Sequence, residues 1–212
     1  MQFNEKITLD ERWLFTVLII AMSAFIVLTF SMRNGHLAEF DQNVLHWFHK
    51  IKNRTLDNFF SSLTWLGSLW ILLPLYLILI LTLSHYFENV EKFLGIGFWG
   101  AFFTTYILKY RLDRKRPRFF STINELPIDP SFPSAHTSQI VTFTLLFWLM
   151  VHNGSSLSDN LFTGVLLFIA SGVALSRMYL QVHFPTDVIA GALIAIAWSC
   201  IAILVIKSGG LA

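Results

Sequence analysis

The sequence predicts an all-α integral membrane protein, a bundle of six transmembrane helices with an interfacial amphipathic helix after the first span. Two observations carry this prediction. Hydrophobic residues make up 55% of the 212-residue chain and charged residues only 13%, whereas a soluble domain carries roughly 25% charged residues to wet its surface. Six apolar stretches, each free of Lys, Arg, Asp and Glu, also follow one another along the chain. This composition excludes a disordered chain and disfavours a soluble globular enzyme.

The apolar stretches define the expected spans. About 20 apolar residues cross a bilayer as a helix, with a range of about 17–25. The first, second and sixth stretches reach that length, and we expect the third and fifth to extend into flanking residues. In chain order they are Trp13–Phe30, Leu63–Leu83, Phe93–Leu108, Ser134–Val151, Leu161–Ser176 and Val188–Ile206.

The start of the chain does not read as a cleavable signal peptide, because Asp10 and Glu11 precede a long apolar stretch and no small-residue cleavage site follows it. The connections between the stretches are too short to divide the chain. We therefore expect one membrane domain over residues 1–212.

The connection Ser31–Ser62 is the long one after the first span. Apolar residues recur in it at near-helical spacing beside several cations: Phe40, Val44, Phe48 and Ile51, with Lys50, Lys52 and Arg54. This pattern predicts an amphipathic helix lying in the membrane interface. A helix that caps the bundle explains the pattern equally well.

Three glycines inside the third stretch, Gly95, Gly97 and Gly100, have the spacing G-x-G-x-x-G. A dinucleotide site would need a strand before this motif and an acidic residue about 20 positions after it. Here the motif lies in an apolar helical run, and the chain about 20 residues on reads Arg116-Pro117-Arg118. The better interpretation is that small residues let two helices approach closely in lipid.

Three clusters of polar residues stand at the ends of the apolar stretches, where charged groups are costly and therefore informative. The first is Lys109-x6-Arg116-Pro117, which follows the third stretch. The second, Pro133-Ser134-Ala135-His136, opens the fourth, and the third, Ser176-Arg177-x5-His183-x3-Asp187, leads into the sixth. Because successive spans alternate in direction, all three clusters are predicted to lie on the same side of the membrane.

Each cluster alone has an ordinary explanation. Boundary cations contact lipid headgroups, Ser134 and His136 can cap a helix, and His183 with Asp187 can form a structural pair. Their joint occurrence favours phosphoryl transfer instead. Lys109, Arg116 and Arg177 supply positive charge for phosphate oxygens, and Ser134 with the amides of a helix start adds neutral donors.

The histidines supply the reactive groups in this interpretation. His183 can attack phosphorus while Asp187, four residues later, holds its other ring nitrogen. His136 is then available to protonate the departing oxygen and afterwards to activate water. We find no carboxylate cluster suited to magnesium beside these groups, so no metal or other cofactor is expected.

The three clusters resemble the signature of the type 2 phosphatidic acid phosphatase superfamily, which includes membrane lipid phosphatases and vanadium haloperoxidases. Its pattern is K-x6-R-P, then P-S-G-H, then S-R-x5-H-x3-D, and this chain departs from it only at Ala135, which replaces the usual glycine. The resemblance implies that His183 forms a phosphohistidine, Asp187 orients it and His136 protonates the leaving group. It implies phosphate binding by Lys109, Arg116, Ser134, Ala135 (through its backbone amide) and Arg177.

Three further cations of the same segment, Arg114, Lys115 and Arg118, match no position of the pattern, and we assign them to headgroup attraction or surface solvation. The expected function is a lipid phosphatase or diphosphatase, with undecaprenyl diphosphate or phosphatidylglycerophosphate favoured by the compact size. The alternatives are a lipid A or phosphatidate phosphatase and a non-catalytic lipid-phosphate binder or transporter. The six apolar stretches oppose a soluble haloperoxidase, and a net charge of +2 suggests no nucleic-acid partner. The expected partners are the lipid phosphate and membrane lipids.

The location expected from the resemblance is a bacterial inner membrane, with the active site on the periplasmic side. Charge counting points the other way. The segments on the side of the clusters hold eleven Lys and Arg residues against four on the opposite side, and eight against four without Lys109, Arg116 and Arg177. Positively charged loops usually face the cytoplasm. We favour the periplasmic side, because functional cations dominate the count.

Overall fold

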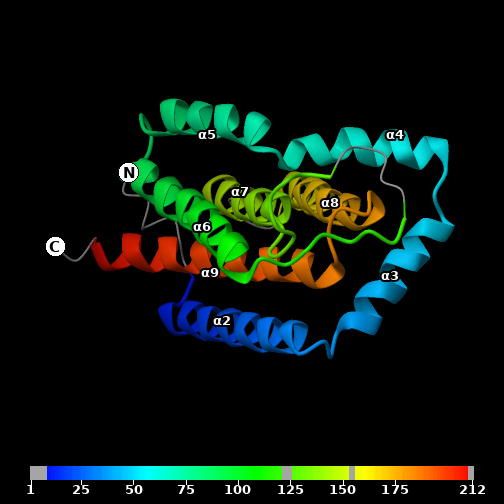
Figure 1. The fold of residues 1–212 in the computed structure, drawn as a ribbon. Helices are drawn as coiled ribbons and strands as arrows, with labels where there is room; N and C mark the ends of the chain where they lie inside the picture. The colour runs from blue at the N-terminus through cyan, green and yellow to red at the C-terminus, as the bar shows by residue number, and fades with distance from the viewer. Residues whose placement is uncertain (1–8, 121–125, 153–155, 210–212) are drawn as a thin grey trace.

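A computed structural model describes residues 9–120, 126–152 and 156–209, and every regular element in these ranges is helical (Figure 1). This agrees with the predicted all-α class. The α-helices are α2 (Glu11–Arg33), α3 (Ala38–Lys50), α4 (Arg54–Leu63), α5 (Leu69–Leu83), α6 (Val90–Leu112), α7 (Ala135–Val151), α8 (Leu157–Tyr179) and α9 (Pro185–Gly209), and a short 3₁₀ helix, η1 (Thr64–Gly67), joins α4 to α5.

Helix α9 is the centre of the bundle. It packs against α2, α6 and α7, and Figure 1 shows α2 running beside its middle part. Its buried positions lie on several faces and include Ala190, Ile194 and Cys200, the only cysteine of the chain, which is 5% exposed. The other faces of the bundle are rich in exposed apolar side chains, such as Ile19 and Phe30 on α2. An apolar exterior over an apolar core is the pattern of a protein solvated by lipid.

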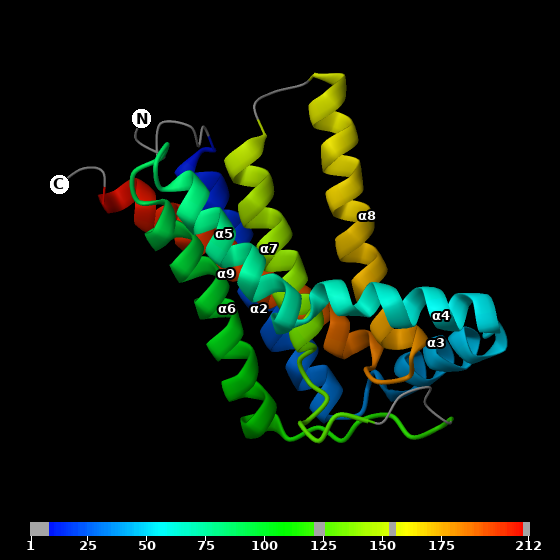
Figure 2. The same ribbon diagram turned by 90° about the horizontal axis from the view of Figure 1, so that it is seen from above.

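The two ends of the bundle differ. The start of α2 and the end of α9 lie together at one end, while α3 lies at the other (Figure 1). The segment between α6 and α7 also runs across this second end, as Figure 2 shows from above. Because α6 and α8 finish here and α7 and α9 begin here, the three sequence clusters come to the same end of the bundle.

Fewer helices meet the length and hydropathy expected of a membrane span than the six that the sequence predicts. Among the described residues α2, α8 and α9 are long and apolar enough to cross a membrane, and α4–η1 with α5 forms a fourth candidate if that pair, bent by 44°, is one span. The predicted helix Leu63–Leu83 is therefore broken: Ser68 is extended, with φ −81° and ψ 148°, and α5 keeps 15 residues. The third and fifth stretches do extend into flanking residues, because α6 and α8 each have 23.

Close helix approach explains two glycines of α6. A Cβ on Gly100 would stand 2.2 Å from the Trp198 ring of α9, and one on Gly97 would stand 2.7 Å from Leu146 of α7. Side chains of α7 and α9 thus occupy the space that a larger residue would fill. The interpretation of these two glycines as packing residues is confirmed, and Gly95 is the less crowded of the three, with Tyr76 at 3.7 Å.

Helix α3 packs against the bundle through one face. Leu45 and Phe48 are buried, and Phe48 joins Tyr179 and Leu180 from the end of α8 in a small apolar cluster. Phe40 and Trp47 are about half exposed. The helix therefore caps this end of the bundle, and its placement in the membrane interface stays a prediction.

Candidate active site

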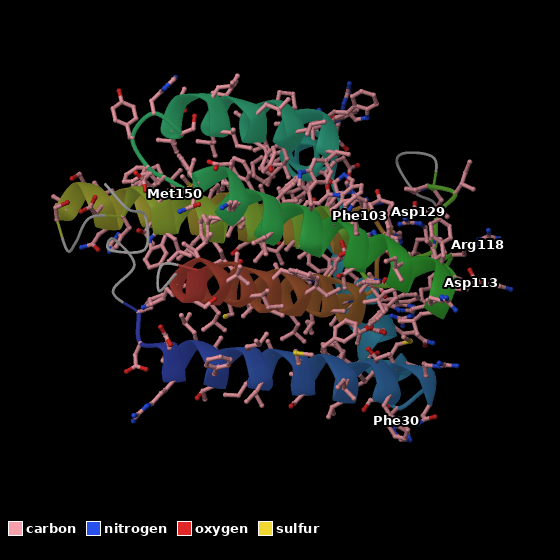
Figure 3. The ribbon with its side chains drawn as sticks, turned by 90° about the vertical axis from the view of Figure 1, so that its left-hand side faces the viewer. Phe30, Phe103, Asp113, Arg118, Asp129 and Met150 are labelled. Carbon is pink, nitrogen blue, oxygen red and sulfur yellow. The ribbon has the colours of Figure 1, made fainter. Side chains whose placement is uncertain are left out.

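The cations of the first cluster hold a carboxylate between them. Lys109, in the last turn of α6, is fully buried, and its Nζ lies 2.8 Å from Asp129 Oδ2. Arg116 donates from Nη2 to Asp129 Oδ1 at 2.8 Å and from Nε to the Asp129 carbonyl at 2.9 Å. Figure 3 shows Asp129 near Asp113 and Arg118, at the end of the bundle where α6 finishes and away from Met150. Lys109 and Arg116 thus form an anion site of the kind that phosphate uses.

Asp129 was not identified from the sequence. The only signal was an acidic residue in a proline-rich segment, just before Pro130. Burial alone would raise the pKa of the Asp129 carboxyl, but the hydrogen bond and charge of Lys109, followed by the charge of Arg116, lower it below its usual value. The carboxylate is therefore ionised at neutral pH and occupies the two cations as an anion.

His183 lies in the turn between α8 and α9, with Arg116 on one ring nitrogen and Asp187 on the other. Arg116 Nη1 is 3.1 Å from Nε2, and Asp187 Oδ2 is 3.3 Å from Nδ1. A guanidinium can only donate and a carboxylate can only accept. The proton therefore belongs on Nδ1, and the Nε2 lone pair faces the cation site.

The His183 ring is buried, with 1% of the residue exposed. Burial, and then the positive charges of Arg116, Lys109 and Arg177, hold its pKa well below the usual 6.5. The imidazole is consequently neutral at pH 7. A neutral ring that keeps its Nε2 lone pair is the form that acts as a nucleophile.

Asp187, in the first turn of α9, is fully buried and receives several donors. Oδ2 accepts from Ser131 Oγ, from the Phe184 amide at 2.8 Å and from His183. Oδ1 accepts from Arg114 Nη1 at 2.6 Å. The carboxylate is thereby fixed on both oxygens in a geometry that serves His183.

The Arg114 contact corrects the assignment of this arginine to headgroups or surface solvation. Its side chain is 17% exposed and pairs with Asp187 and with Asp41 of α3, each at 2.6 Å. Sequence spacing could not reveal this, because Asp41 lies in a helix far away along the chain. Lys115 and Arg118, its neighbours, are exposed as expected.

The second cluster is built around the start of α7. Ser134 is the N-cap residue and its Oγ accepts a hydrogen bond from Thr137 Oγ1 at 3.0 Å, while its amide donates to the Asp187 carbonyl at 3.0 Å. Ala135 begins the helix and is buried, and His136 is partly buried. The first turn of α7 is thus joined directly to the first turn of α9.

Arg177, near the end of α8, is 6% exposed and donates from Nη1 to Thr64 Oγ1 of η1 at 2.6 Å. Its Nε is buried and has no hydrogen-bond partner among the described residues. A buried guanidinium N–H without an acceptor is costly. It is a donor available to an anion at this site.

A cavity of about 600 Å³ reaches the site from between α4, η1, α5 and α8. His136, Arg177 and Val182 are among the residues that line it, and the Val182 carbonyl accepts a hydrogen bond from Arg116. Trp65 and Trp70, which are 58% and 84% exposed, line it as well. The cavity therefore has cationic and aromatic walls, which suit a molecule with a phosphate and an apolar part.

The structure thus places Arg116 of the first cluster against His183 of the third, and Asp129 joins Lys109 to Arg116. Ser134 of the second cluster is joined to Asp187. The family model for the PAP2 superfamily matches residues 73–209. That range contains all three clusters, and the chain belongs to this superfamily.

Relatives of known name agree with this assignment. Phosphatidylglycerophosphatase B of Bacillus subtilis is 27% identical over 174 residues, covering 79% of this chain and 83% of the relative. Dolichyldiphosphatase 1 of Dictyostelium discoideum is 28% identical over 51% of this chain and 48% of its own length. The putative undecaprenyl-diphosphatase YbjG of Escherichia coli is 40% identical over 31% of this chain and 29% of its own.

Two crystal structures have the same fold. The transmembrane PAP2-type phosphatidylglycerolphosphate phosphatase of Bacillus subtilis superposes with a TM-score of 0.76 at 23% identity, covering 92% of this chain and 96% of that one. Aquifex aeolicus LpxE gives 0.63 at 26% identity, over 78% and 95%. With its apolar helices, the chain is a multi-pass membrane protein of the phosphatase class.

Proposed function

We propose that the protein is an integral-membrane lipid phosphatase or diphosphatase that works through a phosphohistidine intermediate on His183 and needs no metal ion. One observation carries the proposal. The Nε2 lone pair of a buried neutral His183 faces Arg116, while Asp187 accepts the Nδ1 proton. A nucleophile, its orienting acid and a phosphate-binding cation are therefore assembled in one place.

In the first step the substrate phosphate replaces the Asp129 carboxylate on Lys109 and Arg116, and Arg177 Nε donates to a third oxygen. The Nε2 lone pair of His183 attacks phosphorus and forms the P–N bond. The bond between phosphorus and the lipid oxygen breaks, and this oxygen leaves with the electron pair. It takes a proton from His136, which is in its cationic form while the anionic phosphate is bound beside it. Asp187 stabilises the positive charge that develops on the His183 ring.

In the second step a water molecule gives a proton to His136 and attacks phosphorus. The P–N bond breaks, inorganic phosphate is released, and His183 returns to the neutral form. His136 regains the proton that it donated in the first step, so the enzyme ends as it began. Lys109, Arg116 and Arg177 bind the phosphate oxygens throughout, and the Ala135 amide at the start of α7 adds a neutral donor.

The proposed substrate is a lipid phosphate, with phosphatidylglycerophosphate and undecaprenyl diphosphate favoured. The cavity supports a lipid because the exposed Trp65 and Trp70 give it an aromatic wall, and such residues are typical of a membrane interface. Relatives named for phosphatidylglycerophosphate, dolichyl diphosphate and undecaprenyl diphosphate support the same class. Lipid A phosphates and phosphatidate are the alternatives within it.

The proposed arrangement in the membrane is a single domain with six spans, in which α6 and α7 cross the bilayer inside the bundle and α4–η1–α5 crosses as one bent element. Helix α3 lies in the interface on the side of the active site. We propose a bacterial inner membrane with the site facing the periplasm.

Phosphate release from a substrate panel in detergent tests the proposal. The panel contains phosphatidylglycerophosphate, undecaprenyl diphosphate, phosphatidate and a lipid A phosphate, each with the wild type and with His183→Ala. We expect release by the wild type alone. Tight binding of a lipid phosphate without release by the wild type would instead identify a non-catalytic binder or transporter.

A further inference from the structure

Arg114 stands between two buried carboxylates, and one of them is the proposed orienting acid. We propose that Arg114 and Asp41 are positioning residues for the reaction: they fix the Asp187 carboxylate, and through it the His183 ring. This inference rests on the proposed function, because it assigns the role of Asp187 that the function requires.

The contacts of Arg114 are specific. Nη1 donates to Asp187 Oδ1 at 2.6 Å and to Thr186 Oγ1 at 2.7 Å, and Nη2 donates to Asp41 Oδ2 at 2.6 Å. The guanidinium carbon lies 4.0 Å from the centre of the Phe184 ring. A planar group that stacks on a ring and donates along two edges has one orientation. Arg114 is therefore a rigid bridge.

Asp41 connects this bridge to the start of α9. It is 1% exposed, and besides Arg114 it accepts from the Thr186 amide at 3.1 Å and from Thr186 Oγ1 at 2.7 Å. Asp41 comes from α3, so this helix contributes to the site as well as covering it. The first turn of α9, which contains Thr186 and Asp187, is consequently held from outside the three sequence clusters.

The two oxygens of Asp187 have separate tasks. Oδ2 faces His183, Ser131 and the Phe184 amide, and Oδ1 faces Arg114. Without Arg114 the buried Oδ1 would lose a charged donor, and rotation about the Cβ–Cγ bond would no longer be opposed from that side. Because Asp187 determines which His183 nitrogen carries the proton, a rotated carboxylate would reduce the fraction of His183 in the reactive form.

Charge balance gives the inference its own signature. The ionisable groups around His183 come from every surrounding element: Asp41 of α3, Lys109 of α6, Arg114, Arg116 and Asp129 of the connection to α7, His136 of α7, Arg177 of α8 and Asp187 of α9. Removing Arg114 deletes one cation and leaves Asp41 and Asp187 less neutralised. Both effects favour the protonated His183 ring, so its pKa should rise.

The experiment compares Arg114→Met, Arg114→Lys and Asp41→Asn with Arg118→Met, a matched loss of an exposed arginine from the same segment, all in full-length protein in detergent. We expect kcat to fall roughly 10–100-fold in Arg114→Met, as is typical when the partner that orients a functional histidine is removed, while KM stays nearly constant. Arg114→Lys should recover part of the loss, and Arg118→Met should match the wild type.

Two readouts separate positioning from simple stabilisation. The acidic limb of the kcat/KM profile should move to higher pH in Arg114→Met, which loses a cation, and to lower pH in Asp41→Asn, which loses an anion. The NMR titration of isotope-labelled His183 should move in the same two directions without substrate. If both variants were folded, with the wild-type kcat and His183 titration, the inference would be wrong. If Arg114→Met did not fold, Asp41→Asn would decide by the same measurements. A wild type inactive on every substrate would refute the proposed function, while the titration would still report on Arg114.

Discussion

The His183 ring combines two features that sequence spacing alone does not supply, burial and a cation on Nε2. Its neutral state follows from them, because a charged imidazole would be costly in this buried, positively charged surrounding. The chemistry of this site is therefore carried by a small number of side chains, and the predictions for single residues are correspondingly sharp.

Replacing His183 with Ala should abolish phosphate release while the protein remains folded in detergent. Within the described part of the chain, no other histidine has a carboxylate on one ring nitrogen and a cation on the other. His136→Ala should reduce turnover by about 10²–10⁴-fold, the usual contribution of a general acid. Substrates with good leaving groups should be partly spared in this variant, because they need less protonation. Turnover by His183→Ala near the wild-type value would show that the nucleophile is another group.

Replacing Asp129 with Asn should strengthen inhibition by inorganic phosphate. The carboxylate of Asp129 now occupies Lys109 and Arg116, and a neutral amide would compete with phosphate less well. The inhibition constant for phosphate, measured beside the exposed control Asp113→Asn, checks this expectation. Weaker phosphate binding in Asp129→Asn alone would mean that Asp129 supports the cations instead of competing for them.

The site residues that belong to motifs of fixed spacing could be predicted from the sequence. The site residues that are brought together only by the tertiary structure could not. His183 and Asp187 are four residues apart around the start of α9, so local geometry determines their contact. Lys109 lies in the last turn of α6 and Arg116 lies beyond its end at Leu112, and Asp129 joins the two cations. Asp41, Arg114 and Asp129 interact across long loops or between separate helices. Their positions depend on how α3 and the segment after α6 fold over the bundle end, which periodicity does not encode.

At the scale of helices, hydropathy located the apolar segments and failed at a bend. The stretch Leu63–Leu83 contains no charged residue, yet the chain is extended at Ser68 between η1 and α5. An average over a window records how apolar a segment is but not its direction. The bend has a functional effect, since it places Thr64 against Arg177 and opens the cavity beside Trp65 and Trp70.

The contact between α7 and α9 gives a testable consequence at this scale. A Cβ on Gly191 would stand 2.6 Å from the Ser134 carbonyl and 3.1 Å from the Ser138 amide, both of them backbone atoms that cannot turn aside. Gly191→Ala should therefore destabilise the protein by about 1–3 kcal/mol, as overpacking does, and should reduce turnover by displacing Ser134 from Asp187.

The matched control is Gly164→Ala in α8, where an added Cβ meets nothing within 4 Å. Replacing a helical glycine in open space with alanine raises the free energy of unfolding by about 0.5–1 kcal/mol. Thermal unfolding of both variants in the same detergent provides the measurement. Equal stabilities for the two would contradict the tight contact at Gly191.

For the whole molecule, the mechanism predicts independence from divalent metal. Lys109, Arg116 and Arg177 already neutralise the phosphate, so excess chelator should leave turnover unchanged. Vanadate should inhibit, because its five-coordinate form resembles the phosphorus in transit between His183 and the leaving oxygen. Activity that disappears with chelator and returns with magnesium would contradict this mechanism.

The orientation in the membrane is the second property of the whole molecule. With the site in the periplasm and six spans, Ala212 is cytoplasmic, so a phosphatase fused after it should be inactive and a fluorescent protein there should fluoresce. The pairing of Arg114 with Asp41 and Asp187 removes one more cation from the charge count. Seven cations then remain on the active-site side against four on the other. By the positive-inside rule this difference still places the active site in the cytoplasm. The reverse fusion pattern would show that this rule, rather than the family, predicts the orientation.

The burial of Cys200 allows the same question to be answered without fusions. Its thiol is the only one in the sequence, and it lies on a buried face of α9. A membrane-impermeant maleimide should therefore leave the intact wild type unlabelled. A cysteine placed at Lys115, on the active-site end, or at Tyr86, which is 70% exposed in the connection between α5 and α6, would then be the sole reactive thiol. Labelling of whole cells at one position and not the other would reveal which end of the bundle faces outward.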